Sequence, residues 1–245
     1  MTMAKQLKIC LDKPAPPEME TLAKQLAVEE NPANAQAPVG GLEMAAQTLF
    51  LWRRGFTLDV RFLDGTPSVR ARVEKYAHQW EEFANIKFRF VEGGRAPIRI
   101  AFMKGGSWSR LGTQALLWQD QQVPTMNYGW LEPNTAEDEY ARVVLHEFGH
   151  ALGCIHEHQH PQNGIQWDKE RAYAYYGAQG WTREEVDFQV FKRYSTFLTQ
   201  FSKFDPTSIM MYPVPEELTL DDFSVGWNRE LSETDKTFIR KLYPF

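Results

Sequence analysis

The chain has 245 residues, of which 43% are hydrophobic and 24% are charged, and its net charge is −5 at pH 7. These values are ordinary for a globular protein with a substantial core. The negative charge and the absence of a basic stripe argue against binding to nucleic acid or to an anionic membrane. No apolar run approaches the about 18 residues that a membrane span requires.

Residues 1–49 are predicted to form an N-terminal extension or linker that precedes a compact domain over residues 50–245. Residues 13–41 are rich in Pro and Ala and leave room for one short helix near Glu18–Glu29. The start of the chain lacks the apolar segment of a secretory signal peptide. We therefore expect a cytoplasmic protein, one exported by a non-classical route, or a trimmed form of a secreted protein.

The predicted domain begins with a half-buried strand, because apolar and polar residues alternate over residues 56–62. An amphipathic helix follows over residues 67–83, with Pro67 in its first turn. Two further strands are expected at residues 86–92 and 98–103.

A loop containing Gly and Ser, residues 105–117, leads to a strand within residues 121–130. Residues 134–153 have helical periodicity, and two more helices are expected to begin at N-cap residues Thr182 and Ser232. In this order, several strands and one helix come first, and the helix over residues 134–153 lies in the middle of the chain. Such an arrangement predicts a mixed α+β domain with a cleft between two halves.

Five of the six histidines lie between His146 and His160, and the sixth, His78, lies on the polar side of the helix predicted over residues 67–83. His146 and His150 are four residues apart on a helix, so their rings can share one metal ion. Gly153 can adopt a positive φ and turn the chain back. His156 can then complete a set of three ligands that leaves a position open for water.

Glu147 follows the first histidine directly, so its carboxylate can reach a water molecule on the metal without binding the ion itself. A catalytic Zn²⁺ lowers the pKa of such a water to about 7 and polarises a carbonyl group. Glu147 can then take the water's proton as a general base. The residue types therefore predict hydrolysis with one catalytic zinc ion.

The pattern His-Glu-x-x-His-x-x-Gly-x-x-His, with Ser208–Tyr212 (SIMMY) downstream, resembles the metzincin zinc peptidases, and Glu157 after the third histidine resembles their astacin branch. The resemblance covers roughly residues 50–245. It implies a mixed twisted sheet, a central metal-binding helix and an irregular C-terminal half that ends in a helix. It also implies that Met210 forms an apolar floor below the zinc. Tyr212 would be a displaceable ligand that also binds the transition state, and Glu157 would meet the mature N-terminus once a pro-segment is removed.

The predicted function is that of a zinc-dependent endopeptidase, monomeric, acting on peptide or protein substrates. By the same resemblance, the substrate would lie extended along an edge strand around Gln122–Tyr128. The alternative from another class is a metzincin-fold binding module or latent effector that holds zinc without hydrolysing peptides. The presence of Glu147 and of all three histidines favours the enzyme.

Other assignments stay open for several residues. Zinc could be structural, with Cys154 near the site, or a downstream Glu170 or Glu184 could replace the third histidine. His158 and His160 are expected to be polar loop or supporting residues rather than ligands.

For Met210 and Tyr212, a plain core role stays possible. The chain has two cysteines, which we expect to be free thiols. Cys10 or the neighbouring Asp12 could bind the zinc and keep the enzyme latent until the extension is cleaved.

Overall fold

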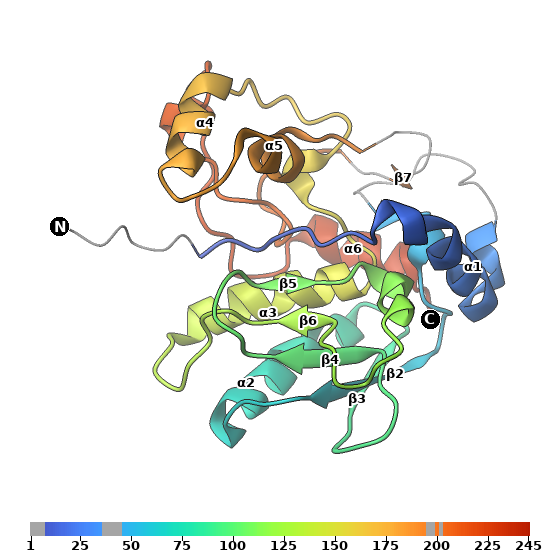
Figure 1. The fold of residues 1–245 in the computed structure, drawn as a ribbon. Coiled ribbons are helices and arrows are strands. Elements are labelled where there is room, and N and C mark those ends of the chain that lie inside the picture. The colour runs from blue at the N-terminus through green and yellow to red at the C-terminus, as the bar shows by residue number, and fades with distance from the viewer. Residues whose placement is uncertain (1–7, 36–45, 195–198, 201–202) are drawn as a thin grey trace.

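The structure, a computed structural model, describes residues 8–35, 46–194, 199–200 and 203–245. Its elements are joined in two halves around a central helix (Figure 1). Within the described residues, no helix has the length and apolarity to cross a membrane.

Five short strands form one sheet in the order β3-β2-β4-β6-β5. The first four are parallel to their neighbours, and β5 runs antiparallel to β6 at the edge. Leu58 and Val60 of β2 are fully buried between more exposed neighbours, as the alternation predicts. The strands are β2 (Thr57–Phe62), β3 (Lys87–Phe90), β4 (Ile98–Ala101), β5 (Trp108–Ser109) and β6 (Met126–Asn127).

The expectation that the segment around Gln122–Tyr128 forms the edge strand of the sheet is wrong. That segment contains β6, an interior strand whose residues are buried, and the edge is β5, inside the segment predicted as a loop. Two residues flanked by Gly and Ser are too few to produce an alternating pattern. The edge therefore depends on pairing with β6, which local sequence does not encode.

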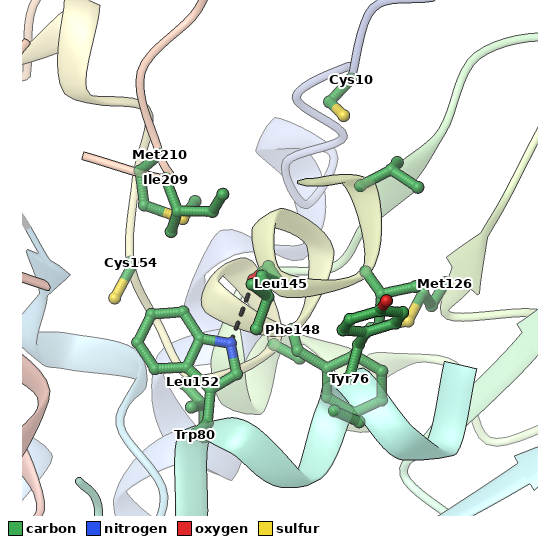
Figure 2. Packing of buried hydrophobic residues seen from close by; sticks show 14 of the residues in the cluster. Cys10, Tyr76, Trp80, Met126, Leu145, Phe148, Leu152, Cys154, Ile209 and Met210 are labelled. Atoms are coloured by element: carbon green, nitrogen blue, oxygen red, sulfur yellow. Dashed lines mark hydrogen bonds between the residues drawn. The ribbon is translucent and has the colours of Figure 1, made fainter. Parts of the chain in front are cut away.

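Two helices, α2 (Pro67–Ala77) and α3 (Glu137–Ala151), pack against the sheet and each other. Acidic residues occupy the first turn of α3, where they complement the positive end of the helix dipole. Leu145 and Phe148 of α3 face Trp80, in the short 3₁₀ turn that continues α2 (Figure 2). The Trp80 Nε1–H donates to the carbonyl oxygen of Leu145 at 3.0 Å. One face of α3 is thus fixed to the core, which leaves the other face for the histidines.

Within the described residues, the remaining part of the domain is irregular and contains three α-helices and one strand, which pairs with a strand of the N-terminal extension. These elements are α4 (Lys169–Gly177), α5 (Arg183–Val186), β1 (Ala46–Gln47), β7 (Thr199–Gln200) and α6 (Glu233–Leu242). The expected N-caps are confirmed, because Thr182 and Ser232 both form capping boxes. The helix α4 has no counterpart among the predicted elements.

The N-terminal region is ordered where the structure describes it. Its helix α1 (Glu20–Glu30) buries Ala23 and Ala27 against Phe50 and Leu117 of the domain. Residues 8–15, which we call the cleft segment, run extended between the two halves of the domain (Figure 1). Leu11 N–H donates to the carbonyl oxygen of Ser107 at 2.8 Å, next to β5.

We predict that Trp80→Phe destabilises the protein by about 1–3 kcal/mol, because it leaves a cavity between α2 and α3 and removes the donor to Leu145. Urea unfolding followed by circular dichroism measures the change. Trp227→Phe is the control, since 38% of that side chain is exposed and its replacement should cost much less. Equal losses in the two variants would contradict this account of the core.

Candidate active site

Three histidines meet at the C-terminal end of α3. His146 and His150 lie one turn apart on this helix, and Gly153 ends it with a φ of +97°. The turn brings His156 back toward the helix, and the three Nε2 atoms lie 3.0–3.1 Å from one another. All three side chains are buried. The structure therefore brings together the three residues that the motif predicts as ligands.

The second ring nitrogens fix the protonation of two of these rings. His146 Nδ1 donates to the carbonyl oxygen of Ile209, and His150 Nδ1 donates to that of Cys154, both at 2.8 Å. Burial lowers the pKa of His150 to about 3 and that of His146 well below its usual value. Both rings are therefore neutral, with the proton on Nδ1 and a lone pair on Nε2. Lone pairs that converge on one point cannot bond to one another, and the arrangement fits a zinc ion held by neutral imidazoles.

Glu147 lies beside this group and is fully buried. Neither carboxylate oxygen has a hydrogen-bond partner among the described residues. A carboxylate oxygen of Glu147, a ring nitrogen of His146 and the Cys10 thiol lie within 4.8 Å of one another. Burial raises the pKa of Glu147 to about 8. A buried carboxyl group without a partner next to converging lone pairs indicates a reactive centre rather than a structural site.

The segment SIMMY forms the floor of the site. Met210 is buried beside α3 (Figure 2), and its sulfur packs where a Cβ at Gly149 would stand. The backbone N–H of Glu157 donates to the Met210 carbonyl oxygen at 2.9 Å, which ties the floor to the segment that carries the third histidine. A glycine is therefore required at position 149 for this close approach. The motif leaves this position unspecified, and no pattern in the sequence indicated that it must be glycine.

Asp235 supports the same floor from α6 and was not predicted as part of the site. Its carboxylate accepts hydrogen bonds from the Ser208 hydroxyl at 2.7 Å and from the Ile209 N–H at 2.8 Å. The Ile209 carbonyl in turn orients His146. The only available signal was the place of Asp235 in the capping box of the last helix.

Tyr212 lies at the side of the site. Its ring stacks on His158 with a centroid distance of 4.2 Å and meets His156 edge-on at 4.3 Å. The phenol is buried, and its hydroxyl has no hydrogen-bond partner among the described residues. This position is compatible with the role that the resemblance implies.

Glu157 is also buried, and burial raises its pKa to about 8. One carboxylate oxygen accepts the N–H of Asp205 at 2.8 Å, and the other has no partner among the described residues. The expected contact with a mature N-terminus stays a prediction, because the described chain still carries the extension whose removal would create that terminus.

The other candidates lie outside the metal group. His158 and His160 are buried supporting residues: His158 Nε2 donates to the carbonyl oxygen of Gln189 at 2.8 Å, and His160 Nδ1 accepts the N–H of Gln162 at 2.9 Å. Glu170 pairs with Arg183, and Glu184 is exposed. Both cysteines are free and buried.

The cleft segment covers the site. Besides Cys10, which faces His146 and Glu147, Asp12 directs a carboxylate oxygen at Nδ1 of His156 from 3.2 Å. A cavity of about 240 Å³ continues the cleft beyond Asp12, with His150 in its wall. The two residues proposed from the sequence as contacts of the zinc thus lie at the site.

We predict that Gly153→Ala weakens zinc binding and destabilises the protein by about 1–2 kcal/mol, because Ala is strained at a positive φ. A Cβ at this position would also lie 2.8 Å from Leu51 Cδ2. Urea unfolding and competition for zinc with a chelator measure the two effects. Gly164→Ala is the control, because nothing lies within 4 Å of its added Cβ. Unchanged zinc affinity in Gly153→Ala would show that this turn does not set the third ligand.

Comparisons with known proteins agree with the geometry. A family model described as Astacin, a peptidase family, matches residues 51–244. A solved structure of myroilysin is 48% identical, covers 82% of this chain and 98% of that chain, and superposes with a TM-score of 0.80. A second myroilysin crystal structure is 42% identical over 97% of this chain and 91% of that chain, with a TM-score of 0.66.

A hatching-enzyme zinc protease from the medaka fish Oryzias latipes shares the fold at 16% identity, with a TM-score of 0.52 over 79% of this chain and 94% of that chain. A comparison with curated proteins gave no match. The predicted family, the α+β fold class and the single catalytic zinc are confirmed. The chain belongs to the astacin family and is a zinc metalloendopeptidase that acts on peptides or proteins.

Proposed function

We propose that His146, His150 and His156 hold the catalytic zinc and that Glu147 is the general base of peptide hydrolysis. The observation that carries this proposal is the convergence of three Nε2 atoms beside a buried carboxyl group without a partner. A zinc ion at this position would lower the pKa of a bound water to about 7 and polarise the scissile carbonyl.

The side chains of this chain supply the proton transfers. Glu147 takes a proton from the attacking water and delivers it to the departing amine nitrogen. The Tyr212 hydroxyl, which has no partner among the described residues, donates to the negative charge that develops on the carbonyl oxygen. Met210 and Asp235 do not react, but they hold the floor on which His146 is oriented.

The substrate lies extended along β5, the edge of the sheet. The cleft segment supports this placement, because Cys10 forms a β-bridge with Ser107, and Leu11 donates to the Ser107 carbonyl oxygen. A peptide at the edge of a sheet gains main-chain hydrogen bonds that do not depend on its sequence.

We further propose that residues 1–49 are a pro-segment and that the cleft segment keeps the enzyme latent. Cys10 lies against His146 and Glu147, and Asp12 faces His156, so both stand where a substrate would have to lie. Burial under this segment also excludes water from Glu147. Cleavage of the extension would open the site to water and substrate.

We expect Glu147→Gln to lower peptide hydrolysis by about 10²–10⁴-fold while zinc content stays unchanged, because the amide cannot accept the proton. The assay uses a broad protein substrate after cleavage of the extension, with bound zinc quantified. Glu137→Gln is a control on the same helix with an exposed side chain. Wild-type protein that binds zinc but cleaves no substrate would favour the binding module instead.

The uncut Cys10→Ala protein should hydrolyse peptides at least about 10-fold faster than the uncut wild type, because one contact that closes the site is removed. After limited proteolysis of the extension, both proteins should have equal activity. Cys154→Ala removes the other buried thiol and serves as the control. Equal activity of the wild type before and after cleavage would contradict latency.

A further inference from the structure

We propose that Gln189 is a substrate-binding residue whose side-chain carboxamide binds the main chain of the peptide in the cleft, from the wall opposite β5. This inference rests on the proposed function and deepens it, because it assigns the second wall of the substrate site.

The carboxamide of Gln189 makes two hydrogen bonds to the backbone of a single residue. The Asp12 N–H donates to Oε1 at 2.8 Å, and Nε2 donates to the Asp12 carbonyl oxygen at 3.0 Å. A glutamine amide offers one acceptor and two donors, so it can imitate a neighbouring strand. Because only main-chain atoms take part, any residue except proline can occupy this position.

The opposite side of the segment is held by the sheet. Leu11 donates to the Ser107 carbonyl oxygen at 2.8 Å, while the next residue, Asp12, bonds to Gln189. Successive main-chain groups of an extended peptide point to opposite sides, so a strand in this cleft meets both walls. The Asp12 side chain faces His156, which places the residue bound by Gln189 directly beside the zinc ligands.

The backbone of Gln189 is held in place by hydrogen bonds on the side away from the cleft segment. It lies in a π-helical turn, Asp187–Phe191, a form that occurs frequently at functional sites. Its carbonyl oxygen accepts hydrogen bonds from His158 Nε2 at 2.8 Å and from Gln159 Nε2 at 3.3 Å. Both donors follow closely after the third predicted zinc ligand, so the carboxamide is held at a fixed position relative to the metal site. This gives the two buried polar residues a positioning role that the hydrolytic mechanism alone does not provide.

The experiment removes one substrate N–H at a time. Zinc-loaded full chain, with its extension cut by limited proteolysis, is assayed on a cleavable peptide and on analogues in which single non-scissile amides are replaced by esters. In the wild type, one ester position beside the scissile bond should lower kcat/KM about 5–10-fold. Gln189→Ala should lower kcat/KM on the parent peptide by a similar factor. In this variant, kcat/KM on the ester analogue should be no lower than on the parent peptide.

Two further variants separate binding from a structural role. Gln189→Glu keeps an acceptor for the substrate N–H and should stay sensitive to the same ester. Gln179→Ala removes a glutamine of the same half whose side-chain amide donates to the Tyr175 carbonyl oxygen, and it should behave as the wild type. The fold-losses of kcat/KM caused by the ester and by Gln189→Ala could instead multiply at every ester position. In that case Gln189 does not bind the substrate main chain and the proposal fails.

A readout without turnover keeps this test independent of the proposed function. The affinity of the same peptides is measured by fluorescence anisotropy in the Glu147→Gln background, where one ester should weaken binding only while Gln189 is present. If the wild type hydrolyses nothing but this dependence appears, the proposed function fails and the Gln189 site stands. If the dependence is absent, the Gln189 site is wrong, whatever the turnover.

Discussion

Two backbone carbonyls, those of Ile209 and Cys154, decide where the imidazole lone pairs point. Each accepts a hydrogen bond from the Nδ1–H of one histidine, so the ring proton is held on Nδ1, and Nε2 is unprotonated and directed into the site. One carbonyl belongs to the floor segment and the other to the turn after α3. The metal site therefore exists only when the helix, its terminal turn and a segment about sixty residues later are in place together.

This dependence explains why much of the C-terminal half is assembled around one short segment. Asp235, the N3 residue of α6, accepts the Ile209 N–H, and the Met210 carbonyl accepts the Glu157 N–H. Three parts of the chain thus meet through backbone groups of the floor. Backbone contacts of this kind tolerate many side-chain changes, provided that glycine remains where Met210 approaches α3.

The sequence was sufficient for what depends on local spacing. The ligand spacing and the glycine after α3 predicted His146, His150 and His156, and alternation or periodicity predicted β2, α2 and α3. The N-cap residues of α5 and α6, Thr182 and Ser232, were found for the same reason, since each capping motif is contained within four residues. These elements are decided by neighbours in the chain.

What the sequence could not supply depends on contacts between distant segments. The edge strand β5 is two residues long and exists through its pairing with β6. Gln189 becomes significant only because Asp12, 177 positions away, lies against it. A polar residue of this kind has no pattern of its own in a single sequence.

The cleft segment is joined covalently to the site that it occupies, and this changes how strong its contacts must be. A tethered ligand experiences an effective concentration of the order of millimolar, so a few main-chain hydrogen bonds are enough to keep it in place. Once the tether is cut, the same few bonds must act at the much lower concentration of the protein itself. A segment held by a few separate contacts, here with Ser107, Gln189 and His156, would then be lost by dilution.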